Sequence, residues 1–405
     1  MDRVILHCDC NSFFASVETA INPQYANVPM AVCGSEEDRH GIVLAKNELA
    51  KKYGIKTAET VYSAKRKCPS LVIASPHYAE YERYSARVNK IYSDYTDMVE
   101  PFGIDESWLD VTASIKLFGS FQNIAEEIRR RVREEIGITV SIGVSFNKVF
   151  AKLGSDYKKP DAITYILRDN FEEIVYPLPV ETLLFVGKRT EEALRRLGIR
   201  TIGDLARFDV RILSGRLGKL GEMLHIYACG LDSSPVSPAN RSDAKSISNG
   251  LTFRRDITSR DDWKTALEYL ADEVGVKLRA NSQCCTGVSL TVKDEFLKSI
   301  QRQRRLDSPT DIGEVIAKCA LSILTEEWPA SKPIRTLTVA AIGLVRSDTL
   351  TQQMDFFSDG KKKVNEKLER KEKTIDIIRQ KFGNSSILSG AVMESDLYSF
   401  GEDET

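Results

Sequence analysis

Short apolar runs, each next to an acidic residue, mark the first part of the chain. The strand-like runs are residues 3–9 (RVILHCD), 107–112 (SWLDVT) and 139–146 (TVSIGVSF). Helix formers follow the first run at once, in residues 13–20 (FFASVETA). The pattern therefore predicts Asp9 at the end of a buried strand, and Asp105 and Glu106 in the GIDE turn that leads into another strand.

The segment between the second and third strands has the period of an amphipathic helix. Its apolar positions recur every three or four residues, at Leu117, Phe121, Ile124, Ile128, Val132 and Ile136. Charged residues such as Glu126 and Arg130 fall on the opposite side. Strands that alternate with such a helix predict an α/β or α+β domain over roughly the first 165 residues, with residues 19–77 as an insertion.

From about residue 167 to 233 the pattern becomes helical with short loops. Thr190 and Thr201 are predicted as helix N-caps and Gly198 as a C-cap. The stretch over residues 232–243 is rich in Ser, Pro, Asn and Asp and has no periodicity, which is typical of a linker. A new domain is therefore expected near Lys245.

The C-terminal part of the chain mixes strands and helices. Residues 246–345 combine strand signals such as VSLTVK with helical segments near 262–280 and 311–327, which predicts a small α+β domain. Beyond Arg346 the chain becomes heavily charged. We expect a tail there that is helical from about 361 to 383 and has no apolar core of its own.

Composition limits the possible classes of protein. A chain of 405 residues is too long for one core and should form about three or four domains. The N-terminus lacks a signal peptide and no apolar run is long enough to span a bilayer, so a cytoplasmic protein outside the membrane is expected. The net charge of −1 does not indicate nucleic-acid binding, so any DNA contact would come from local patches. Eight scattered cysteines without a CxxC motif predict neither zinc ligation nor disulfides.

The acidic residues at the strand ends suit metal-assisted phosphoryl or nucleotidyl transfer. This chemistry needs a few carboxylates that converge on two divalent ions. Asp9, the backbone carbonyl of Cys10, Asp105 and Glu106 could supply oxygen ligands for magnesium. Taken alone, however, an adjacent Asp-Glu pair is more often surface charge, so the residues by themselves leave this interpretation open.

Three segments resemble signatures of one enzyme family, and they occur in the family's order. DCNSFFASVE (9–18), GIDESWLD (103–110) and VSIGVSFNKVFAKLGSDYKKPD (140–161) are similar to the Y-family DNA polymerases, the UmuC and DinB type of translesion enzyme. The resemblance covers about residues 1 to 358. It implies a template-directed polymerase that adds deoxynucleotides to a primer 3′-end opposite damaged or undamaged template, without proofreading.

The same resemblance implies an α+β multidomain fold with the right-hand architecture of that family. The expected parts are a palm (1–18 and 78–166), fingers (19–77), a helical thumb with a helix-hairpin-helix (167–231), a linker (232–244), an α+β little finger (245–346) and a C-terminal tail (347–405). A monomer is expected.

Carried over position by position, the family's metal ligands fall on Asp9, Cys10, Asp105 and Glu106. They would hold two Mg²⁺ ions, for which Mn²⁺ can substitute. The family's triphosphate-binding lysine falls on Lys159. Phe14 falls on the steric-gate position, where an aromatic ring excludes a ribose 2′-hydroxyl, and Phe13 lies beside it in the nucleotide site. The alternative for Phe14 is a core ring, which is the role expected of Phe13.

The chain departs from the DinB pattern at residues 45–51 (AKNELAK), where Ala45, Glu48 and Lys51 replace a Thr, a Tyr and an Arg. Lys51 keeps a positive charge for the triphosphate but lacks the bidentate fork of arginine. Glu48 cannot donate a hydrogen bond as a tyrosine hydroxyl does. A lysine at this point favours the UmuC-like branch.

The resemblance also implies how DNA and a partner protein would bind. The thumb hairpin would contact a DNA phosphate through Gly187, Lys188 and Thr190, and the little finger through Lys245, Arg302 and Arg304. The alternatives are an ordinary helix connection and a solvated charged face. A peptide in the tail is similar to those that dock on the bacterial sliding clamp; it consists of Gln353, Met354, Asp355, Phe356 and Phe357.

Two rival functions also fit paired carboxylates. A nucleotide cyclase on a palm-like domain would use the same metals but would need neither a hairpin thumb nor a clamp peptide. A DNA-binding accessory protein with a decayed site is disfavoured because all three carboxylates and Lys159 are present, while Ala45 and Glu48 leave that possibility open.

Overall fold

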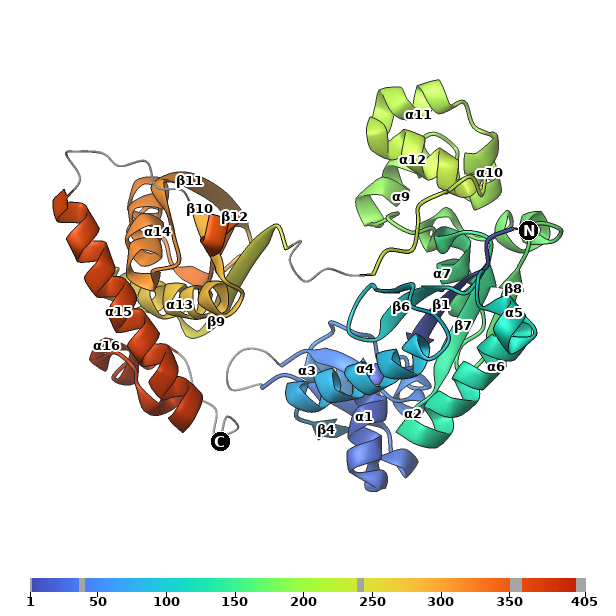
Figure 1. Ribbon diagram of the computed structural model, residues 1–405, viewed down its shortest axis with the longest axis horizontal. Coiled ribbons are helices and arrows are strands. Elements are labelled where there is room, and N and C mark those ends of the chain that lie inside the picture. Colours follow the sequence, from blue (N-terminus) through green and yellow to red (C-terminus); the bar gives the residue numbers. More distant parts are fainter. Residues whose placement is uncertain (1, 36–40, 239–243, 350–358, 398–405) are drawn as a thin grey trace. The chain divides into compact units, whose positions relative to one another are not determined.

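The computed structural model describes residues 2–35, 41–238, 244–349 and 359–397, with side chains from residue 367 onward in the last range. These residues form two compact units, one before and one after the linker near residue 240, and Figure 1 colours them from blue to yellow-green and from yellow to red. Among the described helices, none has the length and apolarity needed to cross a membrane.

A five-stranded sheet organises the first unit. Its order is β5-β6-β1-β7-β8, with β1 antiparallel to both of its neighbours and β7 parallel to β8. The strands are β1 (Ile5–Cys10), β5 (Val99–Pro101), β6 (Glu106–Asp110), β7 (Val140–Ser145) and β8 (Ile163–Ile166). The three strands expected from the sequence are therefore confirmed as β1, β6 and β7, and β1 lies at the centre.

Side chains of β1 alternate between two buried layers. Leu6, Cys8 and Cys10 enter a core shared with helices α4 (Tyr78–Ser93) and α6 (Phe121–Arg131). His7 and Asp9 have the opposite parity and lie on the face that helix α7 (Lys148–Tyr157) covers. The functional residues of β1 therefore face α7.

The helix predicted across residues 117–136 is wrong as a single element. A short helix α5 (Ile115–Phe118) ends at Gly119, whose φ of 86° only glycine adopts readily. Helix α6 then starts with Ser120 as its N-cap and passes into a π-helical turn, η2 (Val132–Ile136). Leu117 is 80% exposed, so it does not belong to the apolar stripe.

Two glycines let α7 approach the sheet closely. A Cβ on Gly143 of β7 would lie 1.9 Å from the carbonyl oxygen of Ala151 and 2.4 Å from the amide nitrogen of Ser155, both in α7. A Cβ on Gly154 would meet the Cα of Gly143 at 2.9 Å. This contact sets the height of α7 above the strands that carry the acidic residues.

The segment inserted between the first helix and α4 has a sheet of its own, in the order β3-β2-β4. The elements are α1 (Phe13–Ile21), η1 (Pro23–Asn27), β2 (Met30–Cys33), β3 (Val43–Lys46), α2 (Glu48–Lys51), α3 (Val61–Lys67) and β4 (Val72–Ala74). Helix α1 runs through the boundary expected at residues 18 and 19, so the insertion leaves the core from the end of α1.

The remainder of the first unit is helical, as expected. It contains α8 (Phe171–Val175), η3 (Val180–Thr182), α9 (Lys188–Arg196), α10 (Ile202–Arg207), α11 (Val210–Leu217) and α12 (Lys219–Ala228). Thr201 is the predicted N-cap, in a capping box with Asp204, and Gly198 follows the C-cap Leu197 with a φ of 81°. The N-cap prediction for Thr190 is wrong because α9 already begins after Gly187, which places Thr190 inside the helix.

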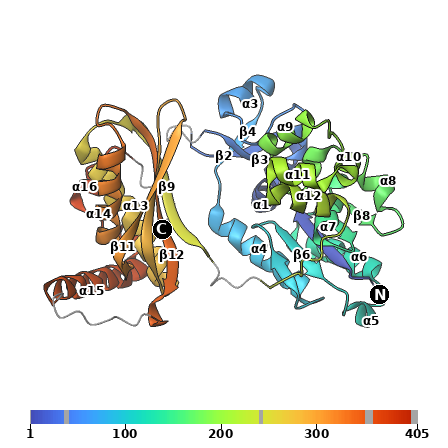
Figure 2. The same cartoon turned by 90° about the horizontal axis from the view of Figure 1, so that it is seen from above.

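The second unit is an α+β layer. Its sheet has the order β11-β10-β12-β9, from β9 (Ser246–Ile257), β10 (Gln283–Lys293), β11 (Ser299–Thr310) and β12 (Ile334–Arg346). Helices α13 (Arg260–Ala280) and α14 (Gly313–Glu327) cover one face, as Figure 2 shows, and confirm the helices predicted near 262–280 and 311–327. Among the described elements of this unit, no helix covers the other face.

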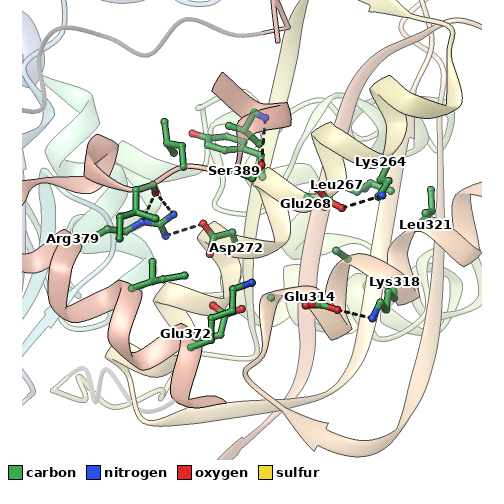
Figure 3. A pocket seen from close by; sticks show the side chains of 18 residues that line it. Lys264, Leu267, Glu268, Asp272, Glu314, Lys318, Leu321, Glu372, Arg379 and Ser389 are labelled. Carbon is green, nitrogen blue, oxygen red and sulfur yellow. Dashed lines mark hydrogen bonds and ion pairs between the residues drawn. The ribbon is translucent and has the colours of Figure 1, made fainter. Parts of the chain in front are cut away.

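The charged segment near the C-terminus folds back onto this unit. Helix α15 (Asp359–Phe382) confirms the predicted helix, and η6 (Asn384–Ser386) and α16 (Gly390–Met393) follow it. Arg279 on α13 binds Asp376, and Arg379 on α15 binds Asp272 at 2.8 Å beside a pocket of about 490 Å³, shown in Figure 3. Leu397 is completely buried, so this part of the expected tail shares the core of the second unit.

Candidate active site

The predicted carboxylates meet at one end of the central strands. Asp9 on β1 is the register partner of Glu106 on β6, so both side chains stand on the same face of the sheet. The amide of Cys10 donates a hydrogen bond of 3.0 Å to the carbonyl of Asp105, which ties the turn before β6 to the end of β1. Asp9, Cys10, Asp105 and Glu106 line one open pocket of about 520 Å³.

The turn after β1 aims the start of α1 at this pocket. Asn11 is 5% exposed and fixes the turn by bonding Thr139 and accepting a hydrogen bond from Ser141. Ser12 adopts a left-handed conformation with a φ of 48°, which turns the chain directly into α1. Ser12, Phe13 and Phe14, at the start of this nine-residue helix, therefore line the pocket, and the N-terminus of a helix favours a bound anion.

Two lysines from the α7 region reach the carboxylates. Lys159 Nζ lies 2.7 Å from Asp9 Oδ2, and Lys152 Nζ lies 2.6 Å from Glu106 Oε2. Asp156, one turn after Lys152, contacts both ammonium groups. In the part of the chain that the structure describes, no three His, Cys, Asp or Glu side chains converge as they would around an ion, and the lysines act as the counter-charges of the pocket.

The pKa values of the three carboxylates reflect their burial and their charged neighbours. Burial raises the pKa of Asp9 to about 6, even though Lys159 beside it favours the charged form, and the charge of Glu106 adds to the rise. Burial also raises the pKa of Asp105, again with help from Glu106. For Glu106 burial acts in the same direction, but the neighbouring His7 and Lys152 outweigh it and lower the pKa to about 2. The three carboxylates line one pocket without converging on a single point, and their oxygens are of the ligand type that a divalent magnesium-like cation prefers.

Phe14 stands on an ordered aromatic platform. Its ring stacks on Tyr81 with centroids 4.1 Å apart and planes 10° from parallel. The hydroxyl of Tyr81 donates to the buried carboxylate of Glu18, which also contacts His77. Phe14 is half-buried and lines the pocket, whereas Phe13 is 3% exposed and packs in the core, so only the ring of Phe14 is free to meet a ligand.

The residues that depart from the family pattern lie in or next to the same pocket. Lys51 and Ala45 both line the pocket. The carboxylate of Glu48 accepts a hydrogen bond of 2.5 Å from Lys51 and one of 3.2 Å from Ser12. Glu48 therefore partly neutralises Lys51 and connects α2 to the start of α1.

The residues predicted to touch DNA are found in different settings. Gly187 is the N-cap of α9, with Lys188 exposed as the first helical residue, but only the three-residue turn η3 precedes this hairpin directly. Lys245 is exposed beside the edge strand β9. Arg302 and Arg304 turn toward the helical layer, where they pair with Glu327 and Glu326 of α14. The clamp-binding peptide, residues 353–357, lies outside the described residues.

Sequence reasoning missed several members of the pocket. It did not select Lys152 and Asp156, although both lie in the segment NKVFAKLGSDYKKP and stand one helical turn apart on the face toward the pocket. It also missed His7, which has the parity of Asp9 in β1 and lies below the carboxylates. Burial lowers the pKa of His7 to about 4, although Glu106 favours its charged form.

Sequence comparison with known proteins identifies the family of this chain. The profile of the impB/mucB/samB family matches residues 8–156, and that of the family's C-terminal domain matches residues 244–356. DNA polymerase IV of Acetivibrio thermocellus is 47% identical over 97% of this chain and 98% of that protein, and DNA polymerase IV of Clostridium kluyveri is 36% identical over 97% and 99%. A solved structure, the Y-family DNA polymerase chimera Dbh-Dpo4(243-245)-Dbh, superposes on this chain with a TM-score of 0.76 at 24% sequence identity. The match covers 85% of this chain and 99% of the chimera, which shows that the two have the same fold.

Proposed function

Because the chain belongs to the impB/mucB/samB family, it is a DNA-directed DNA polymerase of the Y, or translesion, family, and we propose that Asp9, Asp105 and Glu106 form its nucleotidyl-transfer site. The observation that carries the proposal is the direct pairing of Asp9 with Glu106 across β1 and β6 inside the pocket. The names of the relatives do not support the preference for a UmuC-like enzyme that Lys51 suggested.

In this proposal the three side chains and the carbonyl of Cys10 hold two Mg²⁺ ions, with Mn²⁺ as a substitute. The bound metals would activate the primer 3′-hydroxyl and stabilise the charge on the α-phosphate and the departing pyrophosphate. The chain's own part is to fix the carboxylates. Strand pairing sets the spacing of Asp9 and Glu106, and the Cys10–Asp105 hydrogen bond sets the turn, so the site needs little reorganisation when substrate arrives.

The triphosphate would lie along the cationic side of the same pocket. Lys159, Lys152 and Lys51 all line it, and the start of α1 adds backbone amides. An anionic substrate that enters would compete with Asp9 for the ammonium group of Lys159, so we propose that Lys159 releases Asp9 when nucleotide binds, whereas Lys152 stays on Glu106. Glu48 would act similarly as the resting partner of Lys51.

Metal removal tests this function directly. We expect the protein to extend a labelled primer on a DNA template with the complementary deoxynucleotide when Mg²⁺ is present, to stop in EDTA, and to resume when Mn²⁺ is added. The measurement is single-nucleotide extension resolved on a gel with each of the four template bases. Extension in EDTA, or extension that ignores the template base, would contradict the proposed site.

Replacement of Phe14 by alanine should weaken the discrimination against ribonucleotides. We propose that the ring, held flat on Tyr81, lies below the sugar and collides with a 2′-hydroxyl. Relief of an overpacked contact of about 1–3 kcal/mol corresponds to a rise of roughly 5- to 150-fold in ribonucleotide relative to deoxynucleotide kcat/KM. The measurement compares UTP with dTTP in the wild type and Phe14→Ala, with Phe382→Ala, an exposed phenylalanine at the end of α15, as a control. An unchanged ratio in Phe14→Ala would show that another residue is the gate.

The two units would hold DNA through its phosphates. In the first, the exposed N-terminus of α9 at Gly187 and Lys188, with Thr190 in its first turn, suits a phosphate. In the second, we propose that the sheet face without helices lies on the backbone. Arg305 is exposed and has the opposite parity to Arg304, so it belongs to that face, whereas Arg302 and Arg304 could contact DNA only by leaving their glutamates.

The peptide at residues 353–357 would bind a sliding clamp. Described residues on both sides of it belong to the second unit, so the peptide joins β12 to α15. Phe356→Ala with Phe357→Ala should weaken clamp binding by about 30-fold or more, as expected for two aromatic anchors. Surface plasmon resonance on an immobilised bacterial clamp would measure the affinity, with Thr351→Ala as the control. Equal affinities in the two variants would contradict this assignment.

A further inference from the structure

His7 is buried directly below the acidic pocket and has no assigned role. The side chain is completely buried, it stands opposite Trp108 and Gly143 in the sheet, and its ring meets the Trp108 ring edge-on at 5.1 Å. Because Gly143 lacks a side chain, α7 comes close enough for Ser155 to reach the imidazole. The imidazole ring is therefore held in place by Trp108, by the backbone at Gly143 and by Ser155.

Each ring nitrogen faces one oxygen. Nδ1 lies 2.8 Å from Ser155 Oγ, and Nε2 lies 3.3 Å from Glu106 Oε2. Nε2 is also a buried polar atom without a hydrogen bond in the described geometry. A buried nitrogen aimed at a carboxylate is costly as an acceptor and favourable as a donor, so the position of the single imidazole proton decides what His7 does.

The two neutral tautomers of His7 differ in how many buried groups they leave without a hydrogen bond, and the hydroxyl of Ser155 decides the difference. If Nδ1 carried the proton, the lone pair of Nε2 would point at the carboxylate of Glu106, acceptor against acceptor. If Nε2 carries it, Nε2 donates to Glu106 and Ser155 donates to Nδ1. Ser155 then gives up its hydrogen bond of 2.8 Å to the carbonyl of Lys152. That carbonyl still accepts the backbone hydrogen bond of helix α7, so it is not left unsatisfied.

We propose that His7 is a positioning residue for the polymerase site, which donates a hydrogen bond from Nε2 to Glu106 and is itself oriented by Ser155. The proposal rests on the function proposed for Glu106. Lys152 binds the same oxygen, Oε2, at 2.6 Å, so the two donors hold one side of the carboxylate and leave Oε1 for a cation. Partners of this kind fix the rotamer of a metal ligand and tune its basicity.

Two amide substitutions separate the two ring nitrogens. The side-chain nitrogen of glutamine reaches the position of Nε2, whereas that of asparagine reaches only the position of Nδ1. We expect His7→Gln to keep kcat for nucleotide addition within about threefold of the wild type and His7→Asn to lower it by roughly 10- to 100-fold, with a change of less than about threefold in KM for the deoxynucleotide. His225→Asn, a substitution in the helical part of the first unit, is the matched control.

Metal affinity gives a readout that does not depend on turnover. Mn²⁺ binding followed by electron paramagnetic resonance should weaken about 10-fold or more in His7→Asn and stay close to the wild type in His7→Gln. Equal losses in both variants, or a loss only in KM, would overturn the positioning role and leave His7 as a packing residue. A wild type that fails to extend primers would instead refute the proposed function.

The tautomer can be measured in the unmodified protein, so the proposal survives a variant that does not fold. The chain has four histidines, which makes ¹⁵N-histidine labelling sparse enough to resolve. Long-range ¹H–¹⁵N correlation should show a protonated Nε2 and an unprotonated Nδ1 for His7, identified by its absence in His7→Gln. A protonated Nδ1 with a bare Nε2 would overturn the hydrogen bond to Glu106.

Discussion

The variant that combines Asp105→Asn and Glu106→Gln should bind primer-template DNA normally and fail to extend it. Both substitutions keep the shape of the side chains and remove the charges that would hold the metal ions. Loss of several kcal/mol of charge stabilisation corresponds to a fall in kcat on the order of 10³-fold or more. Single-turnover extension gives the rate, and fluorescence anisotropy of labelled DNA gives the affinity.

The charge-matched control for this variant is Glu134→Gln. Glu134 lies on the outer surface of η2 and pairs only with Arg130 among the interactions described, so its neutralisation should leave extension within about twofold of the wild type. DNA binding should not change in either protein, because its contacts go to phosphates outside the pocket. If the double variant still extends primers, these carboxylates are not the active site.

Strand periodicity is enough to place the acidic residues at strand ends. The apolar run before Asp9 is short and ends abruptly, and the turn that contains Asp105 leads directly to Glu106 at the start of β6, so both positions follow from local pattern alone. Their pairing across the sheet does not, since the order of strands depends on contacts between distant segments. The roles of Lys159 and Phe14 came from family resemblance, because their residue types alone equally fit a surface charge and a core ring.

Other features could not be deduced, or were overlooked. The height of α7 above β7 depends on Gly143 and Gly154 together, which are neighbours only in the folded chain, so the reach of Lys152 and Ser155 was not predictable. The orientation of Arg302 and Arg304 could have been predicted from the sequence. Both have the parity of Ile300 and Leu306, which pack against the helices, and that alternation places them on the helical side.

Gly143→Ala should destabilise the first unit and damage the active site together. The new Cβ would meet backbone atoms of α7 at 1.9 and 2.4 Å, and backbone cannot rotate away as a flexible side chain can. Overpacking of this kind costs about 3 kcal/mol, which lowers the midpoint of a thermal transition by roughly 6–12 °C for a unit of this size. Scanning calorimetry would measure the midpoint.

The catalytic consequence follows from the same contact. A shift of α7 away from the sheet by about 1 Å moves Lys152 and Ser155 relative to Glu106, and a displacement of that size costs on the order of 10²-fold in rate. We therefore expect Gly143→Ala to extend primers about 100-fold more slowly than the wild type at temperatures at which it remains folded.

Gly215→Ala is the matched control, because it makes the same chemical change without a clash. Gly215 lies in α11, and a Cβ there meets nothing within 4 Å. Alanine is the better helix former by up to about 1 kcal/mol, so the thermal midpoint should stay or rise slightly and extension should be unchanged. If Gly143→Ala unfolded at the same temperature as Gly215→Ala and extended primers as fast, the glycine contact would not set the position of α7, and the geometry inferred for Lys152, Ser155 and His7 would lose its structural basis.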